Sequence, residues 1–400
     1  MKKFTYEVRD KATDKVEKGK IQAESERLAG KLLVERGYVP LKIKEVGQEG
    51  ALQAFLSRIT TKDKIVFTRQ FATLIGAGLP LAQGLRTVSE QTENKKMRSV
   101  IDDILASVEA GSSLSDSFSK HPEVFDKVYL SLISAGELSG TLDESLRRIA
   151  TQQEKDAAMM SKIRGAMTYP AIVLVVIGLV VAFMMFSVVP QVEKLYKDLK
   201  EELPALTAFM VWFSNFLVNF WWLIFIVLGI AIWFFRQWLK TDSGIKASAN
   251  FKLNVPIFNG LFRKLYMARF TRTGQLLLST GVSMNDMLRI TGDAVNNVVI
   301  KEKIDEANKL VQGGKNLSDS LRDKDYILLL VPQMISIGEQ SGKIDEMMGK
   351  TAQVYEDELD EQIKAISTMI EPLLMVILAV VAGGLIGAIL VPIYGLVNKV

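Results

Sequence analysis

Three long stretches of the chain lack charged residues and are separated by regions of mixed polar character. No Asp, Glu, Lys or Arg occurs in residues 165–192, 203–235 or 372–398. A helix that crosses a bilayer needs roughly 20 apolar residues at a rise of about 1.5 Å per residue, and each stretch contains such a run. The pattern therefore predicts three transmembrane helices, at 170–190, 214–236 and 371–397.

The composition of these stretches favours membrane insertion over burial in a soluble core. Residues 171–189 contain 13 Ile, Val, Leu or Phe, which together favour insertion by about 4 to 8 kcal/mol. All five Trp lie between Trp212 and Trp238, as expected for aromatic residues at membrane interfaces. In the third stretch, Gly383 and Gly387 form a small-xxx-small pair, which predicts close packing against another helix; chance occurrence in an apolar helix is the alternative.

Basic residues flank the first two predicted spans on one side. Lys155, Lys162 and Arg164 precede the first span, and Arg236 and Lys240 follow the second. The positive-inside rule then places the N-terminus in the cytoplasm and residues 191–213 in a short external loop. The first residues show no apolar core typical of a signal peptide, which agrees with a cytoplasmic first domain.

The two regions that flank the middle span resemble each other. Residues 67–69 (Phe-Thr-Arg) recur at 270–272, an offset of 203, and residues 136–140 (Gly-Glu-Leu-Ser-Gly) correspond to 338–342 (Gly-Glu-Gln-Ser-Gly) at an offset of 202. Pro170 and Pro190 match Pro372 and Pro392. A register that holds over more than 120 residues with one deletion indicates duplication of a helical domain followed by a span.

The expected fold is a mainly α integral membrane protein with two duplicated cytoplasmic helical bundles, three transmembrane helices and a small N-terminal α+β appendage. In the appendage, residues 4–8 and 41–44 alternate like strands, and 25–36 has helical character. Within the bundles, Ser283 is an expected helix N-cap, and 141–144 (Thr-Leu-Asp-Glu) reads as a capping box. Besides the three spans and the external loop, the predicted boundaries are 1–46 for the appendage, 47–64 for a linker, 65–169 for the first bundle, 237–264 for a connector and 265–370 for the second bundle.

Residues suited to catalysis or to cofactor and metal binding do not form a recognisable pattern. The chain has no cysteine, and its one histidine, His121, lies in a predicted turn without partners at fixed spacing. Residues 313–315 (Gly-Gly-Lys) lack the rest of a phosphate-binding loop. The net charge is only +4, whereas a protein that binds nucleic acid usually carries a dense stripe of basic residues. We therefore expect no enzyme activity, cofactor, metal or nucleic-acid partner.

Acidic residues are the main candidates for contact with a partner. The run 356–361 (Glu-Asp-Glu-Leu-Asp-Glu) could bind a basic partner or a hard cation, although a solvated helix face is the simpler interpretation. Glu137 and Glu339 occupy matching positions beside glycines, as do Glu144 and Glu346 in the first turns of later helices. These four are candidate partner contacts; for Glu137 and Glu339, hydrogen bonding at a helix end is the alternative.

The whole chain resembles the platform family of type IV pilus assembly and type II secretion, often called PilC and GspF. The most specific part of the resemblance is the sequence that enters the first span, followed by the Phe-Thr-Arg starts and the Gly-Glu-x-Ser-Gly turns of both copies. In the second copy, Glu371 replaces the tyrosine that precedes the proline. The motif residues at the first span are Lys162, Ile163, Ala166, Met167, Tyr169 and Pro170.

The resemblance implies an inner-membrane platform that couples a hexameric motor ATPase to the insertion of pilin subunits into a filament. It also implies pilin or pseudopilin partners, other inner-membrane machine components and a homo-oligomer. A platform for type II secretion or for a DNA-uptake pseudopilus is the main alternative. A repeat-built transporter is disfavoured because the three spans carry no charge, and a membrane-anchored signalling or enzymatic domain because no catalytic pattern is present.

Overall fold

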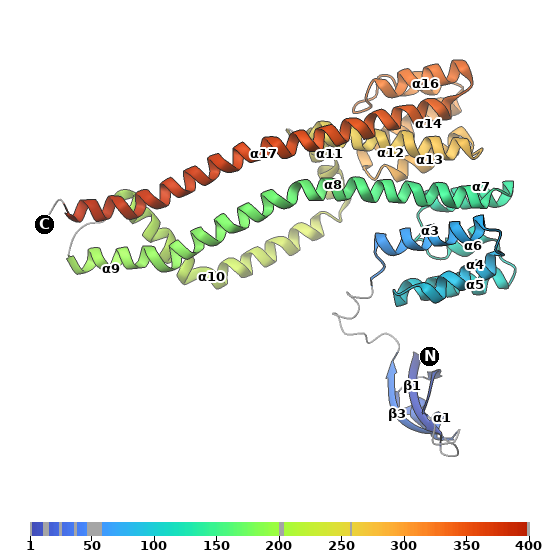
Figure 1. Ribbon diagram of the computed structural model, residues 1–400, viewed down its shortest axis with the longest axis horizontal. Coiled ribbons are helices and arrows are strands. Elements are labelled where there is room, and N and C mark those ends of the chain that lie inside the picture. The colour runs from blue at the N-terminus through green and yellow to red at the C-terminus, as the bar shows by residue number, and fades with distance from the viewer. Residues whose placement is uncertain are drawn as a thin grey trace. The chain divides into compact units, whose positions relative to one another are not determined.

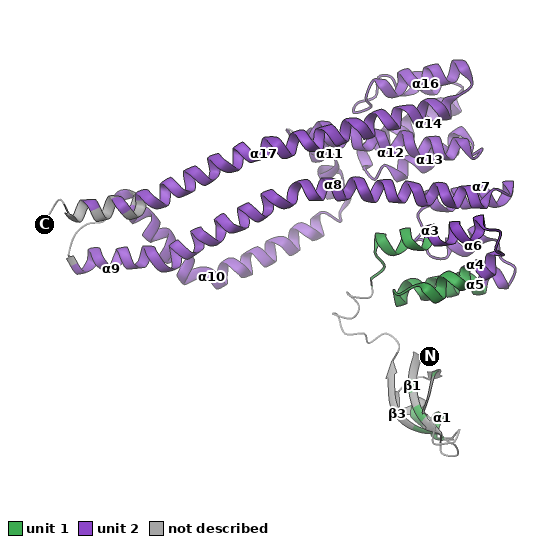
Figure 2. Ribbon diagram, in the orientation of Figure 1, with its two compact units in different colours: residues 1–67, 85–106 green, residues 68–84, 107–400 purple. Residues whose placement is uncertain are grey.

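The computed structural model describes residues 2–10, 16–23, 26–35, 38–45, 58–199, 204–256 and 258–397. The chain divides into two compact units, shown in different colours in Figure 2. The first unit comprises residues 1–67 and 85–106, and the second comprises residues 68–84 and 107–400. The predicted domain boundaries differ from this division and stay predictions.

The first unit begins with a small sheet and one helix. Strands β1 (Lys2–Asp10), β2 (Val16–Ala23) and β3 (Tyr38–Glu45) form an antiparallel sheet in the order β2-β1-β3, and α1 (Glu26–Glu35) follows β2. Val8 and Leu33 are fully buried and join the sheet to the helix. The sequence did not predict β2, because this strand has few apolar residues to mark an alternation.

Helices α3 to α9 carry the first repeat, which we define as residues 67–190. Three of them contribute to the first unit: α3 (Thr61–Gly76), α4 (Leu81–Gln91) and α5 (Lys95–Glu109). In the second unit, α6 (Leu114–Ser119) packs on α7 (Lys127–Ser139), which packs on α8 (Leu142–Phe183). The π-helix η1 (Met184–Val188) and α9 (Val189–Leu199) continue α8.

Helices α12 to α17 carry the second repeat, residues 270–392, and lie entirely in the second unit. Before them come α10 (Ala205–Trp238) and α11 (Asp242–Asn254). Phe270, Met287, Ile300 and Leu359 are among the fully buried core side chains of this repeat. The helices are α12 (Asn259–Ser279), α13 (Met284–Ala294), α14 (Val298–Gln312), α15 (Leu317–Leu321), α16 (Leu330–Ser341) and α17 (Ile344–Val397).

Glycines with positive φ recur at matching places in the two repeats. Gly78 and Gly281 have φ of 85° and 82°, and Gly140 and Gly342 both have φ of 72°. Gly140 and Gly342 follow the last residues of α7 and α16, where the left-handed conformation ends a helix. The duplication therefore extends from the sequence to the backbone conformation of the helix ends.

Among the described residues, three helical segments are long and apolar enough to cross a membrane: Leu142–Asp198, Thr207–Trp238 and Ile344–Gly387. The predicted spans 170–190 and 214–236 fall within the first two segments. The third, 371–397, starts inside Ile344–Gly387 and runs on to the end of α17 (Figure 1). Much of the predicted external loop, 191–213, is helical, because α9 and α10 continue past the apolar core of each span. Where α8 gives way to η1, the Ser214 hydroxyl of α10 donates a hydrogen bond of 2.5 Å to the Met185 carbonyl.

One of the two predicted helix caps is present. The Ser283 side chain accepts a hydrogen bond from the Asp286 amide, which confirms it as the N-cap of α13. The capping box at 141–144 is wrong, because Thr141 makes no cap hydrogen bond to α8 and its hydroxyl instead bonds to that of Ser139. Glu144 pairs with Arg148 one turn later.

Candidate functional site: a polar interface between the repeats

An arginine and a glutamate form the same bidentate pair in both repeats. In the first, Arg69 of α3 donates to both carboxylate oxygens of Glu154 on α8, with a distance of 2.7 Å from Nε to Oε1. In the second, Arg272 of α12 donates to Glu356 of α17 with Nε–Oε1 and Nη2–Oε2 distances of 2.8 Å. Each pair joins the first long helix of its repeat to the last.

The surroundings of the two pairs differ. The side chains of Arg69 and Glu154 are 38% and 43% exposed, whereas those of Arg272 and Glu356 are 12% and 16% exposed. The hydrogen bond from Arg69 lowers the pKa of Glu154 and, in return, raises the pKa of Arg69. Because the second pair is better shielded from water, its charges interact more strongly.

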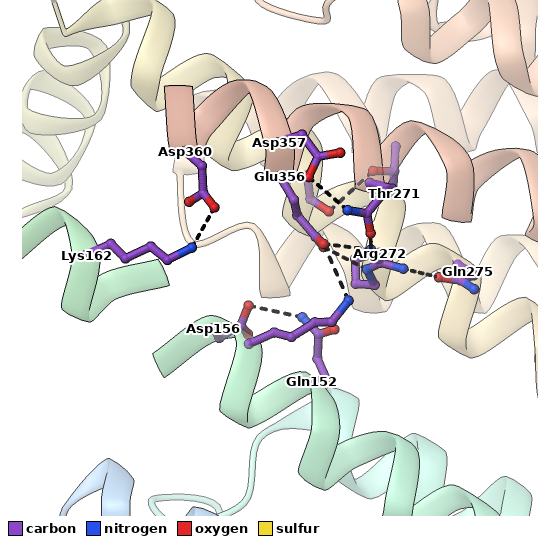
Figure 3. A network of polar contacts seen from close by, with 12 residues as sticks. Gln152, Asp156, Lys162, Thr271, Arg272, Gln275, Glu356, Asp357 and Asp360 are labelled. Carbon is purple, nitrogen blue, oxygen red and sulfur yellow. Dashed lines mark hydrogen bonds and ion pairs between the residues drawn. The ribbon is translucent and has the colours of Figure 1, made fainter. Parts of the chain in front are cut away.

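Glu356 also joins the second repeat to the first. Lys155 of α8 lies 3.5 Å from its carboxylate, so one glutamate meets a cation from each repeat. Two turns along, Lys162 of α8 contacts Asp360 of α17 at 2.5 Å (Figure 3). Glu358 likewise pairs with Lys264 at 2.8 Å, so three of the five acidic residues in the run 356–361 contact basic side chains of their own chain.

A half-buried aspartate lies in the same interface. Asp156 of α8 borders a cavity of about 130 Å³ together with Tyr129, Gln152, Arg269 and Thr273. Gln152 donates a hydrogen bond of 3.0 Å to the Asp156 carboxylate. Burial raises the pKa of Asp156, although Arg269 and Gln152 both act to lower it.

The structure brings Glu144 and Glu346 to one groove between the repeats. The groove has a volume of about 750 Å³ and is lined almost entirely by polar and charged side chains of α8, α12 and α17. Lys350 lies 3.0 Å from Glu346 and, with Lys343, lowers the pKa of this glutamate. The groove therefore carries charges of both signs and suits a polar surface better than an apolar ligand.

Glu137 and Glu339 hold the N-termini of two short helices. The Glu137 carboxylate accepts hydrogen bonds from the amides of Leu114 and Ser115 at 2.7 and 3.1 Å. The Glu339 carboxylate accepts from the amides of Leu317 and Ser318 at 2.6 and 3.3 Å. Both glutamates thus make the helix-end bonds that the sequence left as an alternative, and direct contact with a partner stays a prediction.

The residues of the motif at the first span all lie on α8. Lys162 faces Asp360, and Pro170 is buried. Ile163 and Ala166 are half-buried, and Met167 and Tyr169 are exposed. On α17, a Cβ added to Gly383 would have no described atom within 4 Å. The close helix packing predicted for Gly383 and Gly387 is therefore not made at Gly383 by the described residues.

One known protein domain matches both repeats of the chain. The model of the type II secretion system protein F domain matches residues 67–190 and again residues 270–392, and the model of its N-terminal domain matches residues 1–44. The chain belongs to the type II secretion system protein F family. The double match confirms the duplication, and the family agrees with an inner-membrane protein of a pilus or secretion machine.

Relatives of the family cover almost the whole chain. The type IV pilus assembly protein PilC of Thermus thermophilus is 37% identical over 99% of this chain and 98% of its own length. PilC of Pseudomonas aeruginosa is 36% identical over 92% of this chain and 98% of its own length. The type II secretion system protein F of Vibrio cholerae is 31% identical over 100% of this chain and 99% of its own length.

The paired arginines and glutamates were not selected from the sequence, although a signal was present. Arg69 and Arg272 are separated by the repeat offset of 203, and Glu154 and Glu356 by the offset of 202. Charged residues that recur at both ends of a duplicated domain would have identified the two pairs.

Among the described residues of this family member, no group of three or more His, Asp or Glu could hold a metal ion.

Proposed function

We propose that the chain is the inner-membrane platform of a type IV pilus assembly machine, where it couples a cytoplasmic motor ATPase to the insertion of pilin subunits. The observation that supports this choice is the order of similarity among relatives. Four pilus assembly proteins are 34–37% identical to the chain, whereas four type II secretion proteins are 31–32% identical.

Deletion of the gene in its host tests this proposal. We expect surface filaments, counted by electron microscopy, to disappear while the profile of secreted proteins stays normal. A platform for type II secretion is the second candidate, because its relatives also span nearly the full chain. Retained filaments with lost secretion would select that candidate, and loss of DNA uptake alone would indicate a competence pseudopilus.

The proposed platform has its N-terminus in the cytoplasm, so that both repeats reach the motor. The basic residues that flank the first two apolar stretches support this orientation. Because the chain lacks cysteine, single cysteines at Ser119 and Lys197 can report the two sides of the membrane. A membrane-impermeant thiol reagent should label Lys197→Cys but not Ser119→Cys in intact spheroplasts, and the reverse result would invert the orientation.

We place the motor contact at the end of the first repeat formed by α6 and the end of α7. Leu138 is 87% exposed there, beside Glu137, whose carboxylate holds α6. An apolar side chain this exposed contributes little to the fold and suits a protein contact. The matching residue of the second repeat is Gln340, so the chain itself supplies a polar replacement of similar size.

Leu138→Gln should therefore reduce recovery of the motor ATPase with the purified platform by about tenfold, the scale of one lost apolar contact residue. The melting temperature should stay within experimental error, because the side chain is exposed. Gln340→Ala is the matched control. Unchanged ATPase recovery and piliation in the Leu138→Gln strain would remove this surface from the proposal.

A further inference from the structure

A pocket of about 470 Å³ lies beside the C-terminal end of α10. Its walls come from the residue that follows α10, from α11 and from the turn between α13 and α14. Helix α11 lies outside both repeats, so the duplication supplies no second copy of this wall. The residues that line the pocket include Leu239, Ile245, Ser248, Lys252, Asn296 and Lys301.

The turn from α10 into α11 fixes the pocket beside the end of α10. A Cβ on Gly244 would collide with the Trp238 carbonyl oxygen, so the first turn of α11 lies against α10 only because this residue is glycine. Thr241 caps α11 by accepting a hydrogen bond from the Gly244 amide at 3.2 Å. On the opposite wall, the buried Asn297 caps α14 and donates a hydrogen bond of 3.3 Å to the Ala249 carbonyl. The two walls are therefore tied to each other and to α10.

The charged groups that line the pocket have a positive balance. They are Lys252, Lys301 and Asp293. Asp293 already contacts two cations, Lys301 and, at 2.5 Å, Lys127 of α7. Lys252 is exposed and forms no ion pair with the described residues. An anion that enters the pocket therefore meets an unpaired ammonium group and a carboxylate whose charge is already compensated.

The pocket begins where α10 leaves its apolar stretch. That stretch ends at Phe235, which is 58% exposed, and Trp238 and Ile245 continue the exposed apolar surface to the rim of the pocket. Arg236 and Lys240 lie at the same end, and both are exposed without an ion pair to the described residues. Tryptophan next to lysine and arginine is typical of the depth at which a membrane helix meets lipid headgroups. Lipids of the adjoining leaflet can therefore reach the pocket.

The turn between α13 and α14 supplies a neutral polar group. Asn296 lines the pocket with a φ of 55°, in the left-handed region that asparagine tolerates better than most residues. Its carboxamide can donate hydrogen bonds to an anion without adding charge. The first repeat has Glu93 at the matching position, where a negative charge would repel an anion. The second repeat thus differs from the first at this turn in the direction that favours an anionic ligand.

We propose that the pocket binds the phosphate group of an anionic phospholipid from the adjoining leaflet. Lys252 and Lys301 supply positive charge, Asn296 donates hydrogen bonds, and Leu239 and Ile245 provide an apolar side that is continuous with α10. Basic pockets beside membrane helices suit such headgroups, because the cation meets the phosphate at the depth where the acyl chains begin. The proposal holds for either orientation in the membrane and does not depend on the role in pilus assembly.

Native mass spectrometry of the full-length protein, with phosphatidylglycerol and phosphatidylcholine added in turn, tests the charge requirement. We expect the wild type to bind phosphatidylglycerol several times more tightly. Lys252→Gln should weaken this binding by about fivefold, the effect of one lysine near an anionic lipid surface. Lys315→Gln, which removes the same charge just beyond the other end of α14, should change nothing. Equal affinity for the two lipids, or equal losses in the two variants, would overturn the proposal.

Two further variants separate a shaped pocket from general attraction by surface charge. Ser248→Phe fills the pocket without a change of charge, and Asn296→Asp adds a negative charge in a residue of nearly the same shape. Each should weaken phosphatidylglycerol binding by about fivefold or more, on the same scale as one lysine, with the melting temperature in detergent retained. If only Ser248→Phe misfolds, Asn296→Asp still decides the matter.

Inorganic phosphate serves as the competing soluble anion. At millimolar concentration it should neither displace phosphatidylglycerol nor raise the melting temperature of the wild type, because it lacks the acyl chains that reach α10. A rise that is lost in Lys252→Gln, without binding of phosphatidylglycerol, would show a site for a soluble anion and overturn the lipid assignment. Unchanged phosphatidylglycerol binding in folded Ser248→Phe and in Asn296→Asp would remove the pocket from the proposal altogether.

Discussion

The two repeats place an arginine and a glutamate at corresponding positions, but the second pair serves an additional contact. Among the described residues, the side chains of Arg69 and Glu154 bond only to each other and to Thr151, all within the first repeat, and both are more than one-third exposed. Arg272 and Glu356 are mostly shielded, and Glu356 also meets Lys155 of the first repeat. The same ion pair therefore lies at the surface of the first repeat, whereas in the second repeat it is part of the interface between the two repeats.

Two positions in this region changed charge after duplication. Lys155 in the first repeat corresponds to Asp357 in the second, and the apolar Ala158 corresponds to Asp360. Lys155 contacts Glu356, and Asp360 contacts Lys162. Each changed position therefore leaves one repeat with a charged group that pairs with the other repeat. Three paired substitutions can separate shared features from diverged ones.

The largest difference is expected at the first glycine of the Gly-Glu-x-Ser-Gly turns. A Cβ on Gly338 would lie 2.7 Å from the Ile344 Cα, a backbone atom that cannot easily move, whereas a Cβ on Gly136 would first meet the Ser145 side chain. Gly338→Ala should destabilise the protein by about 2–3 kcal/mol, and Gly136→Ala by about 1–2 kcal/mol. Thermal unfolding of the purified variants in detergent measures both; a larger effect at Gly136 would contradict the geometry.

Removal of the shared glutamate should have the next largest effect. Glu356→Gln leaves Arg272 and Lys155 without their anion in a shielded interface and should cost about 2 kcal/mol. Glu154→Gln should cost about 1 kcal/mol or less, because its pair is exposed to water. Chemical denaturation at neutral pH compares the two, and Asp357→Asn on the same helix turn is the control. Equal losses of unfolding free energy in the two variants would mean that the contact between the repeats does not contribute to stability.

The smallest effect concerns the pH dependence contributed by Asp156. Burial raises its pKa above the ordinary value of 3.8, so its contribution favours the folded state below that value and is lost as the pH rises through the raised pKa. Asp156→Asn should remove this loss and be equally stable or up to about 1 kcal/mol more stable at pH 7. The matching residue, Glu358, pairs with Lys264, and Glu358→Gln should not show this gain.

Melting temperatures of wild type and Asp156→Asn, measured from about pH 4 to about pH 8 and so above the ordinary pKa of 3.8, would reveal the difference. The melting temperature of the wild type should fall relative to that of the variant as the pH rises. A parallel pair of curves would show that Arg269 and Gln152 fully compensate for the burial of Asp156.

Features encoded by neighbouring residues were predictable from the sequence, whereas contacts between distant residues were largely not. Charge-free stretches revealed the three spans, and matched Phe-Thr-Arg and Gly-Glu-x-Ser-Gly segments revealed the duplication. Strand β2 was not predicted, because it contains too few apolar residues to show the alternating pattern of a strand. The Lys155–Glu356 and Lys162–Asp360 contacts join residues about 200 positions apart, and no local pattern specifies which lysine faces which acid.

The candidate site was predicted only in part for the same reason. Glu137 and Glu339 were selected from their place beside glycines, but only the folded chain brings them to the ends of α6 and α15, some 22 residues earlier. Glu144 and Glu346 were matched by sequence, and their approach to one groove depends on how the repeats pack. A capping box at 141–144 satisfied the local pattern and failed because Ser139 competes for the Thr141 hydroxyl.

Helix α17 passes without interruption from the core of the second repeat into the third apolar span. Its 54 residues correspond to about 80 Å of continuous helix. Such a rod acts as a lever: a tilt of only 5° at the end held by the repeat would displace the far end by about 7 Å, over a helix of this length. Lys155 and Lys162 connect α8 to α17 through ion pairs, so the two long helices would tilt together. A small rotation of the repeats would then move the apolar ends of both helices by several ångströms, about the displacement calculated for α17.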